Sequence, residues 1–366
     1  MNYLIYPFSA SLIPFADCIM EFRTDLKIKK YVCPKSWEFS FREEQIIQDN
    51  PIQIETEFST ALDSVDGVIL CDCKNLPWLY KDIVKKIKIA VGRGKKVICC
   101  TPVKDQDLDS IKKIKEYDES KFLYFADYPD LKSLEFSRFQ TQDCIIVGVG
   151  SLLRGVDDSD SFYYMIQKYR ELGYTVVGIG TDFHDALIGG YIFPENIFSS
   201  PRSEEDKILD LNAYINLIQR ETSADVMIVK FPDGMMKYSD ELCEGYGIKA
   251  FMTSQALSVD YFVLNVPMME IFDQESFESL NIGFKYRFGF EIDAIGVNGK
   301  EIDLSNSLEM DKLCYKNLEW KYVLEYVQIA NRECSGILFF PTKLQNEYDR
   351  IVSDSIEKLS GNVEEF

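Results

Sequence analysis

A glycine pattern at the end of an apolar run is the first feature of this chain that could do chemistry. The run at residues 144–149 is followed by Gly150, four residues and Gly155, which is the spacing of a P-loop. A P-loop continues with Lys and then Ser or Thr, because the ammonium neutralises the β- and γ-phosphates and the hydroxyl binds Mg²⁺. Val156 and Asp157 hold these two positions here. The chain therefore has a degenerate Walker A motif, with the glycines in place and the cation missing.

The charges around this loop leave more than one interpretation open. Asp157, Asp158 and Asp160 stand where a helix should begin, and they would stabilise the positive end of its dipole in place of a phosphate. They would also repel a triphosphate in a partly desolvated pocket. A βα turn with acidic N-capping is the preferred interpretation, and the alternatives are another small ligand or ATP or GTP with Mg²⁺, assisted by Arg154. The residues of this nucleotide-binding-like loop are Gly148, Gly150, Ser151, Arg154, Gly155 and Asp157.

The chain has one histidine, His184, which lies in the segment 178–198 between Asp182 and Asp185. An imidazole between carboxylates suits a general base with a raised pKa, or a metal ligand together with Asp182. A histidine exposed in an acidic surface loop is the more frequent case, and it is the preferred interpretation. The candidate catalytic residues are therefore His184, Asp182 and Asp233, without an assigned reaction.

The segment 228–235 occupies the place of a Walker B strand, which ends in an acid that holds the Mg²⁺ shell. Lys230 takes that position, and Asp233 follows three residues later. Without an acid on the strand, magnesium binding is not expected, although Asp233 would be the residue to reach Mg²⁺ if a nucleotide did bind. The Pro-Asp-Gly sequence at residues 232–234 predicts a turn.

Four cysteines end two predicted strands that would neighbour each other in a parallel sheet. Thiolates hold zinc and iron–sulfur clusters, and the carboxyl edge of an α/β sheet is where such proteins bind ligands. Strand alternation points two of the thiols to opposite faces, however, and the spacing matches no known ligand set. Buried small side chains are therefore the preferred interpretation over a metal site. The four residues are Cys71, Cys73, Cys99 and Cys100.

Apolar runs alternate with amphipathic stretches along the chain, which predicts an α/β fold. Residues 1–127 are predicted to form an N-terminal Rossmann-like domain with a parallel sheet. Within it, residues 76–94 have apolar side chains at helical spacing and end at a glycine pair. Residues 128–142 are polar without a clean period and are predicted to connect the domains. Residues 143–366 are predicted to form a degenerate P-loop NTPase-like α/β domain.

The composition excludes several classes of protein. Of 366 residues, 46% are hydrophobic and 27% are charged, which is typical of a globular protein. The net charge of −20 repels phosphate backbones and anionic lipid headgroups, so neither nucleic acid nor a membrane is expected as a partner. No apolar run approaches the length of a membrane span, and the first residues lack the basic region of a signal peptide. Ten cysteines, several of them in apolar runs, suit a reducing compartment, so a cytoplasmic location is predicted.

Several stretches together resemble a small bacterial family, the peptide maturation system proteins. Its members are encoded beside a radical SAM enzyme and a short Cys-rich precursor peptide. The later two-thirds of the chain also resemble the dethiobiotin-synthetase-like branch of P-loop proteins, including a late segment at residues 284–294. The chain departs from that branch at the Lys, the following Ser or Thr and the strand-end acid, so the resemblance implies the fold without ATP hydrolysis. The stretches that carry the first resemblance are residues 5–15, 148–155, 173–194 and 231–241.

These observations indicate two possible functions. The preferred one is a mainly non-catalytic scaffold in the maturation of a ribosomally synthesised peptide, which docks the precursor peptide or the radical SAM modifying enzyme and needs no cofactor. The alternative is a nucleotide-dependent ligase or transferase, in which Arg154 or Lys230 supplies the charge and His184 or Asp182 moves a proton. A thiol or metal carrier built on the four cysteines is a third hypothesis. The sequence does not predict the oligomeric state.

Overall fold

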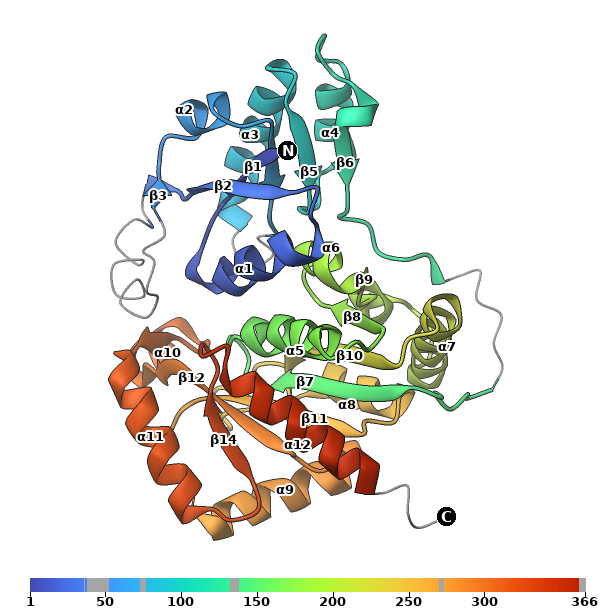
Figure 1. Ribbon diagram of the computed structural model, residues 1–366, viewed down its shortest axis with the longest axis vertical. Helices are drawn as coiled ribbons and strands as arrows, with labels where there is room; N and C mark the ends of the chain where they lie inside the picture. Colours follow the sequence, from blue (N-terminus) through green and yellow to red (C-terminus); the bar gives the residue numbers. More distant parts are fainter. Residues whose placement is uncertain (36, 38–52, 73–76, 132–137, 270–272, 362–366) are drawn as a thin grey trace. The chain divides into compact units, whose positions relative to one another are not determined.

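The structure is a computed structural model that describes residues 1–35, 37, 53–72, 77–131, 138–269 and 273–361. By their internal contacts these residues divide into two compact units. The first unit comprises Met1–Tyr128 and Asp182–Ile192, and the second comprises Pro129–Thr181 and Phe193–Phe366. Figure 1 follows the chain through both units. The predicted second domain was a continuous stretch, whereas the structure groups residues 182–192 with the first unit.

The first unit is built on a six-stranded sheet with the order β3-β2-β1-β4-β5-β6. Every neighbouring pair in it is parallel. This order is that of the Rossmann fold, in which the direction of winding reverses between β1 and β4. The strands are β1 (Asn2–Tyr6), β2 (Lys27–Val32), β3 (Ile54–Glu55), β4 (Gly67–Leu70), β5 (Lys96–Cys99) and β6 (Phe122–Tyr124).

Helices of the first unit form where apolar residues recur at helical spacing. In the third of them, Ile83, Val84, Ile87 and Val91 are buried and join one apolar cluster with the strands β4 and β5. That helix ends at Gly92, and Gly94 just beyond it has a φ of +65°, so the predicted glycine-rich end is confirmed. The helices are α1 (Ile13–Phe22), α2 (Phe58–Asp63), α3 (Tyr80–Gly92) and α4 (Asp105–Lys112).

The second sheet has eight strands with the order β13-β12-β11-β7-β10-β8-β9, in which β14 also pairs with β12. Seven of these strands belong to the second unit, and β9 lies in the segment 182–192 that groups with the first. The pairs β7–β10, β8–β10, β7–β11, β11–β12 and β12–β14 are parallel, whereas β12 and β13 are antiparallel. The chain passes from β10 across β7 to β11, so the winding reverses at β7. The strands are β7 (Ile145–Ser151), β8 (Val176–Gly180), β9 (Gly190–Ile192), β10 (Val226–Gly234), β11 (Tyr261–Met268), β12 (Ala294–Ile302), β13 (Tyr315–Asn317) and β14 (Leu338–Pro341).

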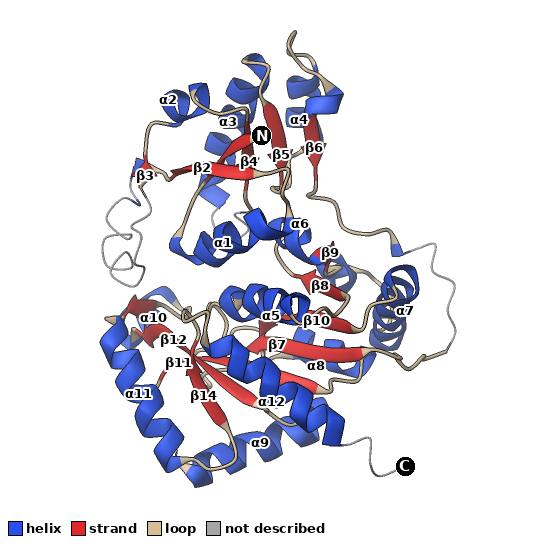
Figure 2. Cartoon of the chain, viewed as in Figure 1, coloured by secondary structure: helices blue, strands red, loops and turns tan. Residues whose placement is uncertain are grey.

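Helices cover this second sheet, as Figure 2 shows. The first of them, α5, packs against β8, β10 and the last helix, α12. The phenol of Tyr169 and the hydroxyl of Ser355 join α5 to α12 by a hydrogen bond of 2.5 Å. The remaining helices of the second unit are α7 to α11. Their bounds are α5 (Ser159–Glu171), α7 (Glu204–Thr222), α8 (Ile248–Ala256), α9 (Gln274–Phe288), α10 (Leu304–Met310), α11 (Trp320–Glu333) and α12 (Glu347–Gly361).

The predicted α/β class, a Rossmann-like parallel sheet followed by a second, mainly parallel sheet, is confirmed by these two units. The helix predicted from apolar spacing at residues 76–94 is present as α3. The longer helix α7 begins where the hydroxyl of Ser203 accepts a hydrogen bond from the N–H of Asp206 at 3.1 Å. Short elements were not predicted, among them α8, α10 and the antiparallel strand β13. Among the described residues, no helix combines the length and the apolar character that crossing a membrane requires.

Candidate functional site

Two glycines of the predicted nucleotide-binding-like loop lie within the strand β7. Gly148 and Gly150 face the ring of Phe262 on β11. A Cβ atom at these two positions would lie 2.6 and 2.9 Å from that ring, closer than van der Waals contact allows. Packing against β11 therefore accounts for glycine at both positions. Gly155 differs from them because its φ of +83° places it in the left-handed region.

Carbonyl groups of the turn after β7 are held by side chains of the same unit. Ser151 donates its hydroxyl hydrogen bond to the carbonyl of Val156 at 3.1 Å. A P-loop instead presents backbone N–H groups to a phosphate. Three side chains from β12 and β13 donate to further carbonyls: Tyr315 to Arg154 at 2.6 Å, Lys300 to Gly155 at 3.1 Å and Asn298 to Asp157 at 3.1 Å. The turn is thus fixed from the side of β12 and β13.

A buried ion pair stands at the start of α5. Nζ of Lys230, whose side chain is 2% exposed, lies 3.2 Å from Oδ1 of Asp158. The same ammonium donates to the hydroxyl of Ser159 at 3.4 Å. The hydroxyl of Ser151 shares its one proton between the carbonyl of Val156 and Oδ2 of Asp158, which is 3.0 Å away, so both carboxylate oxygens have a partner. Burial raises the pKa of Asp158 to about 6, although the nearby charge of Lys230 acts in the opposite direction.

This pair corrects the expected role of the acids. Asp158 is the N-cap residue of α5, but its side chain makes no capping hydrogen bond and binds Lys230 instead. Asp157 accepts a hydrogen bond from the N–H of Ser159 at 3.0 Å, so an acid does satisfy one backbone donor there. The pair lies at the carboxyl ends of β7 and β10, where winding reverses and α/β proteins usually bind ligands.

Asp233 is engaged by two cations beside this pair. Its oxygens lie 3.1 Å from Nε of Arg154 and 3.9 Å from Nζ of Lys249. The predicted turn at residues 232–234 is instead the end of β10, where the register shifts and Gly234 pairs with Ser151. Asp233 has a φ of +68°, which is uncommon for a residue other than glycine. The cation that a nucleotide would have required, Arg154, is thus already paired with an acid.

The expectation that His184 is exposed on the surface is wrong. Its side chain is buried, and its ring meets the ring of Phe15 edge-on at 5.1 Å between centroids. His184 lies in a 3-10 helix, η7 (Phe183–Asp185), that starts with a capping box between Asp182 and Asp185. The backbone N–H of Phe183 lies 3.5 Å from Oδ2 of Asp72, just past β4. His184 and Asp182 are therefore brought together, whereas Asp233 belongs to the other unit.

Three of the four candidate cysteines lie in the described part of the chain. Cys71, Cys99 and Cys100 are buried, and burial raises the pKa of Cys99 to about 12 and that of Cys100 well above its usual range. The raised pKa values of Cys99 and Cys100 favour the protonated thiol, whereas metals bind the thiolate. Cys73 lies outside the described residues.

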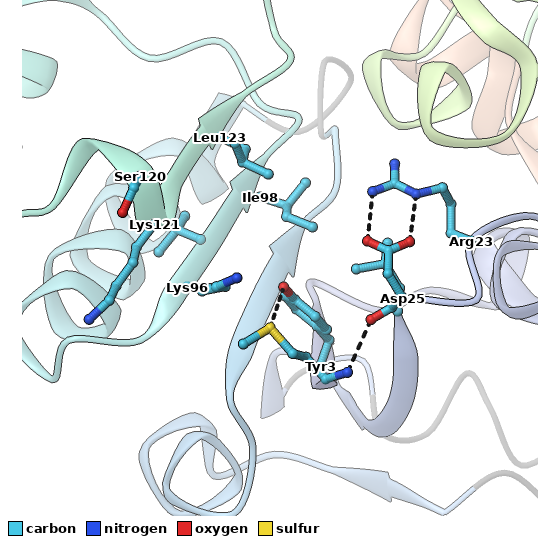
Figure 3. Close-up of a pocket in the computed structure, with 11 residues that line it drawn as sticks. Tyr3, Arg23, Asp25, Lys96, Ile98, Ser120, Lys121 and Leu123 are labelled. Atoms are coloured by element: carbon cyan, nitrogen blue, oxygen red, sulfur yellow. Dashed lines mark hydrogen bonds and ion pairs between the residues drawn. The ribbon is translucent and has the colours of Figure 1, made fainter.

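The first unit also contains a cavity of about 310 Å³, drawn in Figure 3. Its lining comes from the amino ends of β1, β5 and β6 and from the connection between α1 and β2. Arg23 and Asp25 form a two-pronged ion pair there, with hydrogen bonds of 2.9 and 3.0 Å. Lys96 and the apolar Leu123 lie on the strands β5 and β6, and Lys121 lies just before β6. The cavity is at the amino edge of the sheet, opposite to the edge where α/β folds bind ligands.

Comparison with known proteins bears on the fold of the chain. No model of a protein family matches the sequence, and no curated protein matches it. Among solved structures, a DUF1611 family protein from Anabaena variabilis is similar, with 9% identity, a TM-score of 0.59 and coverage of 97% of this chain and 99% of that one. The apo form of PAB0955, a GTPase from Pyrococcus abyssi, matches with 15% identity, a TM-score of 0.29 and coverage of 60% and 99%. The first similarity supports the two-part α/β fold alone.

Proposed function

We propose that this chain is a mainly non-catalytic binding scaffold that acts in the maturation of a ribosomally synthesised peptide. The observation that carries the first half of the proposal is the buried pair of Lys230 and Asp158, 3.2 Å apart at the strand edge where a nucleotide phosphate would sit. The carboxylate of Asp158 gives Lys230 the negative partner that a phosphate gives the lysine of a P-loop. The second half rests on the resemblance of the sequence to peptide maturation system proteins.

A nucleotide would have to displace this internal partner. Separating a buried ion pair by losing one member costs roughly 3–5 kcal/mol, because the other charge remains uncompensated in a low dielectric. Two further acids, Asp157 just before α5 and Asp160 in its first turn, would add to the repulsion of a phosphate. The cost of displacement and the added repulsion both oppose nucleotide binding at this edge.

The proposed partners are the precursor peptide and the radical SAM enzyme that modifies it. A surface with a net charge of −20 favours partners with basic segments, and such attraction speeds their association. No nucleic acid and no membrane are expected as partners, on the same electrostatic ground.

Calorimetry with Mg²⁺–ATP and Mg²⁺–GTP tests the scaffold half of the proposal. No heat of binding is expected for the full chain at millimolar nucleotide. The matched variant Lys230→Met should also give no heat of binding, because Lys230 is already ion-paired with Asp158. Saturable binding that the Lys230→Met variant loses would contradict the scaffold and support a nucleotide-dependent ligase or transferase with an atypical P-loop.

That alternative has one structural observation in its favour. The guanidinium of Arg154 is next to the turn and its side chain is 53% exposed, so it could reach a phosphate if it left Asp233. Turnover of ATP or GTP that falls in an Arg154→Gln variant would support this enzyme over the scaffold.

The peptide half of the proposal is tested separately. The genes next to the coding sequence should include a radical SAM enzyme and a short Cys-rich reading frame. Each encoded product, purified with the full chain, should bind it in an ionic-strength-dependent manner. A neighbourhood without either gene would remove the basis for the peptide half and leave the scaffold half standing.

A further inference from the structure

Three donor side chains gather in a single turn of the first unit. One ligand atom from each of Asp182, His184 and Asp185 lies within 4.8 Å of the others. Nε2 of His184 is 3.9 Å from Oδ1 of Asp185. Over the described ranges of the chain, no other group of three or more His, Cys, Asp or Glu side chains comes together in this way.

Backbone hydrogen bonds orient both carboxylates of this turn. Oδ2 of Asp185 accepts from the N–H of Asp182 at 2.9 Å, and the side chain of Asp182 accepts from the N–H of Asp185. A carboxylate has two oxygens, and this reciprocal capping box uses one from each acid. The acids are therefore held on the same side of the turn as the imidazole, as preorganised metal ligands are.

Two of the three donor side chains in this turn are buried. The side chain of Asp185 is 0% exposed and that of His184 is 6% exposed. Carboxylates in such surroundings attract a bound cation strongly, because the low dielectric screens their charge less than water does. Burial and the neighbouring thiols raise the pKa of Cys100, and the carboxylates of Asp72 and Asp185 raise it further. Both acids therefore lie close enough to this thiol to act on it electrostatically.

The position of the turn in the fold points in the same direction. Asp72 follows β4, and its Oδ2 lies 3.5 Å from the N–H of Phe183 in the turn. The turn is therefore at the carboxyl edge of the first sheet. Strands β1 and β4, between which the winding of a Rossmann-type sheet reverses, are neighbours in it. Open α/β sheets bind their ligands outside the carboxyl ends of the strands at such a point.

We propose that Asp182, His184 and Asp185 bind a divalent first-row transition metal ion, of the class of Mn²⁺, Fe²⁺ and Zn²⁺. One imidazole with two carboxylates suits these ions, whereas Ca²⁺ and Mg²⁺ prefer oxygen ligands alone. Ligand atoms around such an ion lie about 3–4 Å apart, given bonds of about 2.0–2.2 Å. The present spacing of up to 4.8 Å is slightly wider than this, so the ligands must draw together when the ion binds. The site stands on observations separate from those behind the proposed scaffold function.

Mn²⁺ binding to the full chain, freed of metal with a chelator, is the first test. Mn²⁺ binds thiols weakly, so the ten cysteines of the chain do not obscure the result. An electron paramagnetic resonance titration should show one bound Mn²⁺ per chain. His184→Asn and Asp185→Asn should each weaken binding by about tenfold or more. The control is Asp240→Asn, an acid with a 93% exposed side chain in the second unit, which should bind Mn²⁺ like the unmodified protein.

A second measurement uses the unmodified protein, so it needs no folded variant. Because the chain has a single histidine, labelling that residue with ¹⁵N marks one imidazole only. Pulsed electron paramagnetic resonance of the bound Mn²⁺ should then show coupling to one ¹⁵N nucleus. Absence of binding at millimolar Mn²⁺ and Zn²⁺, absence of the nitrogen coupling, or equal binding by a folded His184→Asn variant would each overturn the proposal.

Discussion

Lys230 and Asp158 are buried ion-pair partners, with 3.2 Å between Nζ and Oδ1. Lys230 comes from the strand β10, where a P-loop protein has its strand-end acid, and Asp158 is the residue immediately before α5. The negative partner of Lys230 is thus a carboxylate of the protein itself. The two opposite charges therefore lie against each other at the carboxyl edge of the second sheet.

Removing one member of this pair should destabilise the protein strongly. We expect Lys230→Met to lower the free energy of unfolding by roughly 3–5 kcal/mol, because Asp158 is left buried without its cation. The double variant Lys230→Met/Asp158→Leu should recover most of that loss, since no buried charge then remains. Urea denaturation of the four proteins of this cycle measures the coupling. Equal losses in the single and the double variant would contradict the ion pair as described.

The raised pKa of Asp158 predicts how this stability depends on pH. Its pKa is about 6 in the folded protein against an ordinary value of 3.8, so the folded state binds more protons between these two values. Its contribution to stability is therefore fully present below pH 3.8 and is lost as pH rises through about 6. The difference in unfolding free energy between the unmodified protein and Asp158→Asn, measured by urea at several pH values, should change within that window. A constant difference would exclude the shifted pKa.

The packing of β7 against Phe262 can be tested with glycine variants. Gly148→Ala should lower the free energy of unfolding by about 1–3 kcal/mol, because the new methyl group overlaps the ring. Gly283→Ala, in the helix α9 with no heavy atom within 4 Å of the added carbon, is the matched control. It should be neutral or stabilise the protein by up to about 1 kcal/mol. A destabilised control and an unaffected Gly148→Ala would show that the ring contact has another geometry.

Thiol reactivity should follow burial. We expect Cys99 and Cys100 to resist alkylation in the native protein at pH 8, because both are buried and their pKa values are raised. The partly exposed Cys243 and Cys314 should react first. Mass spectrometry of peptides after timed alkylation assigns each site, and denatured protein serves as the reference. Rapid native labelling of Cys99 or Cys100 would show that the carboxyl edge of the first sheet is open to reagents.

Local patterns in the sequence determined the elements and the class of fold. Apolar spacing predicts α3, and the alternation of strands with helices predicts parallel sheets. The degenerate Walker A motif and the lysine in place of a strand-end acid are also visible without coordinates. These features are local because side chains a few residues apart decide them.

Tertiary structure decided which of those residues meet. Lys230 binds Asp158 because β10 and β7 are neighbours, although 226–234 and 145–151 are distant in sequence. Likewise, Gly148 serves packing because β11 brings the ring of Phe262 against it. His184 is buried because residues 182–192 group with the first unit, which an acidic flanking sequence could not reveal. Strand order and long-range packing set these contacts, and neither is encoded in the spacing of residues along one segment.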